Sequence, residues 1–501
     1  MTFPTPVQAL APNTADFERL PLVKQTGFRE YDARWKFPGE INLMGVQALG
    51  LGLGTLLHEK GITPPAIAVG HDYRSYSLSI KQALITGLMA AGCQVHDIGL
   101  ALSPMAYFAQ FALDVPAVAM VTASHNDNGW TGVKMGCERP LTFGPDDMNA
   151  LKQIVLEGRF VLKSGGGYRY VDHFGETYIA ALANRAKLKR PIRAVAACGN
   201  GTAGAFAPEA LRRVGVDVVE LDTELDYTFP NYNPNPEDLA MLNAVAEKVR
   251  ASGAEVGLCF DGDGDRCGII DNEGRPIFAD RVGVMLARDI SALHEGAKFI
   301  ADVKSTALFA TDPVLKANGA VTEYWKTGHS YIKRRTAETG AIAGFEKSGH
   351  FFFAEPLGRG YDDGLIAAFA VLDMMDRNPG KSFAELERAL PRTFQAPTMS
   401  PHCDDEKKYS VVDKVTAHFK ALAAGGGELA GQKITDLITI NGVRIVLEDG
   451  TWGLVRASSN KPELVVVVES PTSERNMRAI FAGIDAHLSG YAEIGEYNQK
   501  I

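Results

Sequence analysis

The chain carries the stretch Val-Gly-Leu-Cys-Phe-Asp-Gly-Asp-Gly-Asp-Arg at residues 256–266. Its first five residues form a short apolar run, which predicts a buried β-strand. Three aspartates, Asp261, Asp263 and Asp265, then alternate with glycines that let the backbone turn tightly. Carboxylate oxygens are hard ligands, and Mg²⁺ is commonly held by carboxylates together with phosphate oxygens. The stretch therefore predicts a magnesium site at the end of a strand.

A calcium loop of the EF-hand type is the first alternative for these aspartates. Counted from Asp261, such a loop needs glycine at its sixth position and glutamate at its twelfth, where this chain has Arg266 and Asn272. A solvated acidic turn is the second alternative. It is disfavoured because carboxylates buried at a strand end are costly without a partner.

An earlier loop reads Thr-Ala-Ser-His-Asn at residues 122–126 and follows the apolar run at 118–121. Ser124 is therefore predicted to lie where a strand ends. His125 and Lys134 supply hydrogen-bond donors and positive charge nearby. A lone Ser-His-Asn string is more often an ordinary turn, but with a metal loop in the same chain the serine can carry a phosphoryl group.

Both loops, in this order, resemble those of the alpha-D-phosphohexomutase superfamily, and most closely its phosphomannomutase/phosphoglucomutase group. Further segments extend the resemblance along nearly the whole chain. They are residues 28–34 with Tyr31 and Arg34, the proline-rich residues 229–236, residues 302–304 with Lys304, the segment Gly328-His329-Ser330, the loop from Glu346 through Ser348 to His350, and residues 456–462 with Arg456, Ser458, Asn460 and Lys461.

The resemblance implies an α/β fold of three related domains with mixed or parallel sheets and a smaller C-terminal α+β domain, arranged around a central cleft. The expected domains are residues 1–174 with the phosphoserine loop, 175–276 with the metal loop, 277–392 with the sugar-recognition loop and 393–501 with a phosphate-binding loop.

The order of strands and helices supports this organisation. Residues 65–99, 193–222 and 298–328 each read as a strand, a polar or glycine loop, a helix and a second strand. A glycine after each helix is the expected left-handed cap. Such alternation predicts mainly parallel sheets, which bind ligands beyond the carboxyl ends of their strands.

The pattern changes after about residue 393. Residues 395–397 read as a linker and residues 425–427 as a glycine loop. Strands are expected at 452–455 and 464–468, on either side of the cationic loop at 456–461. These features predict the smaller C-terminal domain.

The resemblance also implies an intramolecular phosphotransferase that interconverts hexose 1-phosphate and hexose 6-phosphate, with mannose, glucose or both as the sugar. Ser124 would carry the phosphoryl group and complete the Mg²⁺ site of Asp261, Asp263 and Asp265. Hexose 1,6-bisphosphate would be the intermediate and activator.

Other residues take expected roles from the same resemblance. Arg34, His125, Lys134 and His350 would stabilise the transferring phosphoryl group or move protons. Glu346 and Ser348 would hold sugar hydroxyls. The remaining predicted substrate contacts are the phosphate-binding Arg456, Ser458, Asn460 and Lys461, and the cleft residues Tyr31, Lys304, Gly328, His329 and Ser330.

Three alternatives remain open. The sugar can be glucosamine, as in phosphoglucosamine mutases. The chain can be a sugar phosphatase with Asp261 as nucleophile, but Ser124 and the C-terminal loop would then have no role. A non-catalytic sugar-phosphate sensor is disfavoured because the serine and all three aspartates are present.

Composition is consistent with an enzyme of small metabolites. The chain has 501 residues, too many for one core, and its net charge is −9 with basic residues dispersed, which argues against nucleic acid and membranes as partners. The amino terminus lacks a signal-peptide pattern, no apolar run reaches the length of a membrane span, and the six cysteines show no metal or disulfide spacing. We expect a cytoplasmic monomer or homodimer.

Overall fold

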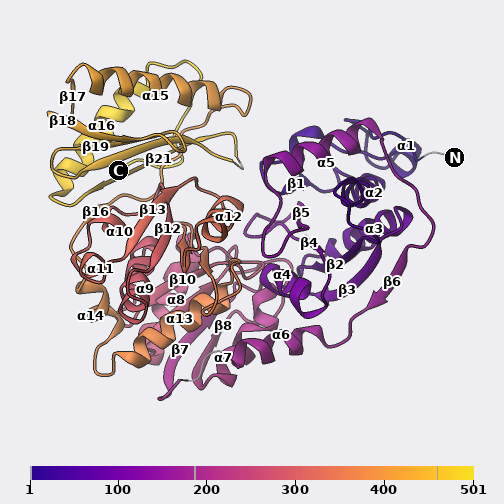
Figure 1. The fold of residues 1–501 in the computed structure, drawn as a ribbon, viewed down its shortest axis with the longest axis horizontal. Helices are drawn as coiled ribbons and strands as arrows, with labels where there is room; N and C mark the ends of the chain where they lie inside the picture. The colour runs from indigo at the N-terminus through magenta and orange to yellow at the C-terminus, as the bar shows by residue number, and fades with distance from the viewer. Residues whose placement is uncertain (1–2, 185–187, 460) are drawn as a thin grey trace. The chain divides into compact units, whose positions relative to one another are not determined.

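The computed structural model describes residues 3–184, 188–459 and 461–501. The chain divides into two compact units. The first unit comprises residues 1–279 and 348–384, and the second comprises residues 280–347 and 385–501. Figure 1 follows the chain through the helices and strands of both. Among the residues described, none of the helices is both long enough and apolar enough to cross a membrane.

The first sheet of the first unit is mixed. Its strands are β1 (Ala33–Lys36), β2 (Ala66–His71), β3 (Gln94–Leu100), β4 (Ala117–Val121), β5 (Trp130–Gly136) and β6 (Gly167–Tyr170). They lie in the order β1-β5-β4-β2-β3-β6, with β5 antiparallel to β4 and β1 and the other pairs parallel. The helices of this part are α1 (Ala15–Arg19), α2 (Leu43–Glu59), α3 (Ser77–Ala90), α4 (Ser103–Ala112) and α5 (Pro145–Glu157).

Glycines let α2 and α3 approach until their backbones touch (Figure 1). A Cβ on Gly50 of α2 would lie 2.2 Å from the Leu84 carbonyl oxygen, and one on Gly87 of α3 would lie 2.1 Å from the Gln47 carbonyl oxygen. Both separations are far below van der Waals contact. These two positions therefore require glycine for packing, although glycine weakens a helix intrinsically.

The second sheet of the first unit carries the aspartate stretch. Its strands are β7 (Ile192–Ala197), β8 (Val216–Leu221), β9 (Val256–Phe260), β10 (Cys267–Asp271) and β11 (Pro276–Ile277). The order is β11-β10-β9-β7-β8; β7 is parallel to β8 and β9, and β9 to β11 form an antiparallel meander. The other elements of this part are α6 (Phe174–Ala183), α7 (Ala207–Arg213), α8 (Leu239–Ser252), β15 (Phe351–Phe353) and α13 (Gly364–Arg377).

The second unit contains three parallel strands in the order β13-β12-β14. They are β12 (Lys298–Asp302), β13 (Val321–Trp325) and β14 (Ala343–Phe345), accompanied by α9 (Ala279–Leu293), α10 (Leu308–Thr311), α11 (Pro313–Ala317) and α12 (His329–Thr339). The single helix expected between β12 and β13 is instead two short helices. The break falls at Asp312, whose side chain caps α11 just before Pro313, a residue that cannot continue the hydrogen bonds of α10.

The C-terminal part of the second unit is an antiparallel sheet in the order β16-β21-β20-β19-β18-β17. Its elements are β16 (Phe394–Gln395), α15 (Lys408–Ala424), β17 (Glu428–Leu429), β18 (Gln432–Ile438), β19 (Val443–Leu447), β20 (Trp452–Ala457), β21 (Leu464–Ser470) and α16 (Glu474–Leu488). Both helices cover the same face of the sheet (Figure 1). The predicted linker at 395–397 is partly wrong, because Gln395 pairs with Glu469 of β21.

The predicted repeat of strand, helix and strand is confirmed in all three stretches. The pairs β2–β3, β7–β8 and β12–β13 are parallel, and each is connected through helix. The glycines after the helices, Gly92, Gly215 and Gly319, have φ values of +85°, +96° and +66°. The strands expected before the serine and aspartate loops are β4 and β9, so both loops lie at carboxyl ends of strands.

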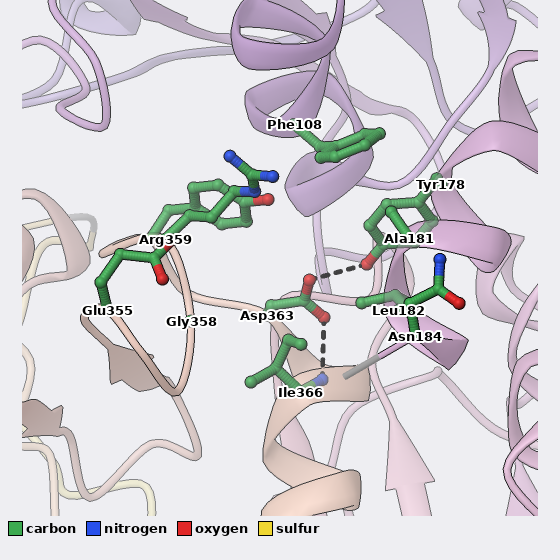
Figure 2. A pocket seen from close by; sticks show the side chains of 11 residues that line it. Phe108, Tyr178, Ala181, Leu182, Asn184, Glu355, Gly358, Arg359, Asp363 and Ile366 are labelled. Carbon is green, nitrogen blue, oxygen red and sulfur yellow. Dashed lines mark hydrogen bonds between the residues drawn. The ribbon is translucent and has the colours of Figure 1, made fainter. Parts of the chain in front are cut away.

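Asp363 joins α13 to α6 in the first unit, beside a pocket of about 380 Å³ (Figure 2). Its side chain accepts hydrogen bonds from the amides of Leu365 and Ile366, which caps α13, and from the hydroxyl of Tyr178 at 2.7 Å. Burial raises the pKa of the Asp363 carboxyl to about 6, although these hydrogen bonds favour the ionised form.

We expect Gly87→Ala to destabilise the first unit by about 1–3 kcal/mol, because its new methyl group must push α2 and α3 apart. The matched control is Gly39→Ala, since a Cβ at Gly39 meets no atom within 4 Å. Urea unfolding of both variants measures the difference. Equal midpoints for Gly87→Ala and wild type would contradict the packing argument.

Asp363→Asn should change how stability depends on pH. An unfolded aspartate has a pKa of about 3.9, whereas Asp363 in the fold has a pKa of about 6. Because the folded state binds this proton more tightly, the stabilisation is complete below pH 4 and is lost as pH rises through 6, an effect on the order of 3 kcal/mol. The asparagine variant should therefore gain stability relative to wild type between pH 4 and pH 7.5. Thermal melts of wild type, Asp363→Asn and the exposed control Asp217→Asn across this range measure the effect. If the Tm of Asp363→Asn depended on pH in the same way as the Tm of wild type, the assignment would be refuted.

Candidate active site

Ser124 lies just beyond the carboxyl end of β4 and is 2% exposed. Its backbone is in the left-handed region, with φ of +52°, and its amide donates to the Thr122 hydroxyl at 2.9 Å. The Ser124 hydroxyl donates to Asp261 Oδ2 at 3.0 Å and lies 3.2 Å from His125 Nδ1. The serine and aspartate loops, distant in sequence, thus meet in the first unit.

The turn between β9 and β10 brings its three aspartates together. One carboxylate oxygen from each of Asp261, Asp263 and Asp265 lies within 4.8 Å of the others, and all three residues are fully buried. Oδ1 of Asp263 and Oδ1 of Asp265 have no hydrogen-bond partner among the described residues. Buried carboxylate oxygens without donors fit a hard cation, so this group could hold a metal ion.

Three further hydrogen bonds, from two residues, fix the shape of this turn. Ser103, the first residue of α4, donates its hydroxyl to Asp263 Oδ2 at 2.5 Å and its amide to the Asp263 carbonyl at 2.9 Å. The Arg266 amide donates to Asp261 Oδ1 at 3.2 Å. The carboxylates are therefore held from two sides before any ion is bound.

Lys134 on β5 provides the positive charge closest to this group. Its ammonium donates to Asp263 Oδ2 at 2.7 Å and also to Asp265. Burial alone would lower the pKa of Lys134, but the charges of these two carboxylates outweigh it and raise the pKa well above its ordinary value. Lys134 therefore remains charged.

The carboxyl groups respond in opposite directions to this environment. Burial, together with the charges of Asp265 and Asp263, raises the pKa of Asp261 well above its ordinary value. Burial also opposes ionisation of Asp263, yet the charge and hydrogen bond of Lys134 hold its pKa below the ordinary value. The positive charges of Lys134 and Arg266 therefore do not offset the three buried carboxylates, whereas a divalent cation would oppose the rise in the pKa of Asp261.

Arg34 approaches the serine loop from β1. Its Nε donates to Asp32 at 2.9 Å, and its Nη1 donates to the Ala123 carbonyl at 3.2 Å and to the Asn126 side chain at 2.5 Å. Burial would lower the pKa of Arg34, but the charge and hydrogen bond of Asp32 act in the opposite direction, and the pKa is raised above its ordinary value. The predicted residue Tyr31 is buried in the segment just before β1.

His350 also belongs to the aspartate group, within the first unit. Its Nε2 accepts a hydrogen bond from Arg266 Nε at 2.9 Å. Its Nδ1 lies 3.0 Å from Asp362 Oδ2 and 3.7 Å from Asp265 Oδ1. Nε2 therefore carries the lone pair, and the imidazole proton faces the carboxylates. Ser348, two residues earlier, is 7% exposed.

In the second unit, Lys304 lies near both Glu346 and Asp302, the last residue of β12. The Lys304 ammonium is 3.7 Å from Asp302 and 4.0 Å from Glu346. Burial raises the pKa of Asp302, against the effect of Lys304. Asp302 also accepts hydrogen bonds from the Thr327 hydroxyl and the Lys347 amide, so it connects the separate segments that carry the predicted sugar contacts.

Gly328, His329 and Ser330 form the start of α12, with Gly328 as N-cap at a φ of +130°. The preceding Thr327 amide donates to Asn441 Oδ1 at 3.4 Å, and Arg456 Nε donates to the same oxygen at 2.7 Å. Asn441 thus joins the α12 loop to the predicted phosphate-binding loop of the second unit.

The predicted phosphate-binding loop is shorter than expected, because Arg456 is still part of β20. Arg456 Nη2 donates to the Ser459 hydroxyl at 3.1 Å, and Ser458 Oγ accepts from the Lys461 amide at 3.3 Å. The predicted Asn460 lies outside the described residues.

Arg444 fixes the Lys304 segment within the second unit. It is 2% exposed and lies between the rings of Trp452 and Tyr324, 3.6 Å and 4.5 Å from their centroids. Its Nη1 donates to the carbonyls of Val303 and Ser305 at 2.9 and 2.8 Å. A side chain of the C-terminal sheet thus holds the backbone on both sides of Lys304.

Sequence reasoning missed several residues that shape these groups: Asp72, Arg74, Ser103, Asp362 and Asn441. For Asp72 a signal existed, because it follows the first strand of the predicted strand-helix-strand stretch at residues 65–99, the position where parallel sheets place functional groups. Ser103 and Asp362 gave none, since their partners lie far away in sequence. None of the predicted site residues lines the pocket of Figure 2.

Comparison with known families identifies the four parts of the chain. Models of the phosphoglucomutase/phosphomannomutase family match along the chain: alpha/beta/alpha domain I at residues 25–161, domain II at 169–274, domain III at 278–394, and the C-terminal domain at 402–487. The predicted fold class, three α/β domains and a smaller C-terminal domain, is thereby confirmed.

Individual relatives agree with these matches. A phosphomannomutase/phosphoglucomutase of Pseudomonas putida is 32% identical over 451 residues, 90% of this chain and 93% of that protein. A phosphoglucomutase of Neisseria meningitidis serogroup A is 33% identical over 89% of this chain and 93% of that protein. The crystal structure of a phosphoglucomutase/phosphomannomutase family protein from Burkholderia thailandensis superimposes with a TM-score of 0.84 at 31% identity, covering 94% of this chain and 98% of that one. The chain therefore belongs to the phosphoglucomutase/phosphomannomutase family and is a phosphohexomutase, an isomerase.

Proposed function

We propose that this phosphohexomutase interconverts the 1- and 6-phosphates of mannose, glucose or both, through a phosphoserine at Ser124 and a hexose 1,6-bisphosphate. One observation carries the proposal: the Ser124 hydroxyl lies 3.0 Å from Asp261, inside a buried group of three carboxylates and one ammonium. Charged groups of this kind stabilise phosphoryl transfer, which depends mainly on positioning and electrostatics.

Mg²⁺ would be held by Asp261, Asp263 and Asp265 together with the Ser124 phosphate. The carboxylate oxygens of Asp263 and Asp265 that accept no hydrogen bond from the described residues support this assignment. When bound, the ion would neutralise charge on the transferring phosphoryl group. Lys134 and Arg34 would add positive charge beside it, while His125 and His350 would bind or move protons.

The transfer conserves atoms. The bond between phosphorus and Ser124 Oγ breaks as a bond forms to the free 6-hydroxyl of hexose 1-phosphate, whose proton passes to a base. After the bisphosphate has reversed its orientation in the site, Ser124 Oγ attacks the phosphorus at position 1, and the sugar oxygen that leaves takes a proton. The products are hexose 6-phosphate and the regenerated phosphoserine.

Further predicted residues would take part in substrate recognition. Arg456, Ser458 and Lys461, with Asn460, would bind the phosphate that does not react. Glu346 and Ser348 would hold sugar hydroxyls. Tyr31, Lys304, Gly328, His329 and Ser330 would contribute further contacts.

The proposed domain boundaries lie after residues 174, 276 and 392. The protein would be a cytoplasmic monomer or homodimer whose partners are small sugar phosphates and not nucleic acids or membranes. Dispersed basic residues and a net charge of −9 support the exclusion of nucleic acid.

The first test is coupled turnover of mannose, glucose and glucosamine 1-phosphates with Mg²⁺ and a trace of glucose 1,6-bisphosphate. We expect 6-phosphates from the first two, and a loss of at least about 1,000-fold in kcat for Ser124→Ala, since the phosphoryl carrier is removed. The ratio of the turnover rates of mannose 1-phosphate and glucose 1-phosphate identifies the preferred sugar. Turnover of glucosamine 1-phosphate alone would indicate a phosphoglucosamine mutase. Release of free phosphate, with Asp261 essential and Ser124 dispensable, would instead identify a phosphatase.

A second prediction concerns Mg²⁺ itself. Millimolar Mg²⁺ should raise the Tm of the wild type, because a ligand of the folded state alone stabilises it. Asp263→Asn should reduce this increase strongly, whereas the exposed Asp217→Asn should preserve it. Differential scanning fluorimetry compares the increases rather than the absolute Tm values, since Asp263→Asn also removes a partner of Lys134. An undiminished increase in Asp263→Asn would exclude the aspartate turn as the metal site.

A further inference from the structure

We propose that Arg74 is a positioning residue that holds the phosphoryl-carrying loop in its reactive conformation. The proposal rests on the function given above for Ser124. Arg74 lies in the first unit, in the segment between β2 and α3, and is 5% exposed. It does not belong to the groups that sequence reasoning assigned to the reaction.

The guanidinium binds the serine loop at four points. Nη2 donates to the Ser124 carbonyl at 3.0 Å and to the Asn126 carbonyl at 2.6 Å. Nη1 donates to the Asp127 carbonyl at 3.2 Å and to the Asn128 side chain at 3.4 Å. One side chain therefore spans the loop from the serine to the turn that leads into β5.

Asp72 orients Arg74 and the loop together. Its Oδ2 accepts from Arg74 Nε at 3.3 Å and from the Ala123 amide at 3.3 Å, while the Ser77 hydroxyl donates to its other oxygen. The Phe229 ring covers the guanidinium, 5.3 Å from its central carbon. The arginine is thus fixed by a buried carboxylate and an aromatic ring.

The donor count separates positioning from direct catalysis. A guanidinium has five N–H donors, and the five bonds described above use one from Nε, two from Nη1 and two from Nη2. No donor is left for a phosphate or a sugar. Arg34 contacts the same loop at a different atom: it donates to the Asn126 side chain, whereas Arg74 donates to the Asn126 carbonyl.

The loop needs such support because Ser124 is in an unfavourable conformation. A non-glycine residue with φ near +52° is in the left-handed region, which is unfavourable for L-residues because Cβ lies too close to the following carbonyl oxygen. The bond from Arg74 to the Ser124 carbonyl stabilises this conformation, in which the hydroxyl points at Asp261. A serine that repeatedly gives and takes a phosphoryl group must return to this position each time.

Arg74→Lys tests the proposal, because lysine keeps the charge but has no planar fork to bind several carbonyls. We expect kcat for glucose 1-phosphate to fall about 100-fold, as for a small misplacement of a reacting group, with KM changed less than about threefold. The rate at which glucose 1,6-bisphosphate phosphorylates Ser124, followed by intact mass, should fall by the same factor. Arg212→Lys, at an exposed site on α7, is the matched control.

Two further measurements keep the test decisive. In Arg74→Ala, guanidinium ion well below denaturing concentrations should restore part of kcat, which a general loss of folding would not allow. Hydrogen exchange in Arg74→Lys should rise in residues 122–129 and stay unchanged in β9. An unchanged kcat, unchanged exchange in the loop, or a loss confined to KM would overturn the proposal. A wild type with no phosphorylation of Ser124 would refute the mutase mechanism instead, while the exchange result would still report on the loop.

Discussion

Three buried carboxylates and one buried ammonium lie together beside Ser124, and their charges do not balance. Asp261, Asp263 and Asp265 can carry three negative charges, against the positive charge of Lys134 and that of the Arg266 guanidinium, 4.0 Å from Asp261. The raised pKa of Asp261 expresses this excess. A divalent cation would supply the missing positive charge, and a phosphate on the serine would then complete its coordination. The surrounding structure keeps the four groups close enough for this balance to matter.

The mixed character of the two sheets in the first unit explains how the groups meet. Parallel strands deliver Ser124 and Asp261 to carboxyl ends, as in other α/β folds. The antiparallel strand β5 then runs back beside β4, with Lys134 paired to Met120, so that its ammonium returns to the end where the serine lies. The antiparallel pair β9–β10 likewise folds Arg266 back over the aspartate turn and toward His350.

Much of the fold could be predicted because its signals are local. The apolar runs at β4 and β9, the repeated strand-helix-strand pattern and the glycines after helices each depend on neighbouring residues. The break between α10 and α11 was missed although Pro313 marks it. Gln395 was assigned to a linker because its strand pairing is with Glu469, a residue far away in the sequence. The serine and aspartate loops could be singled out for the same local reasons. Their supporting residues could not, since nothing near Ser103 indicates a bond to Asp263 and nothing near Arg74 indicates that it binds the carbonyl of Ser124.

The Arg444 sandwich has a consequence for how the second unit responds to ligands. The guanidinium belongs to the C-terminal sheet but satisfies carbonyls on both sides of Lys304, and Asn441 makes a parallel connection from Arg456 to the Thr327 amide. Separating the two halves of this unit would leave a buried charge and several backbone groups without partners, which is costly. Whatever stabilises the Arg456 loop therefore also stabilises the segment around Lys304. Energy gained by the proposed binding of a phosphate at the Arg456 loop would thus be available, by thermodynamic linkage, to order the residues proposed to meet the sugar.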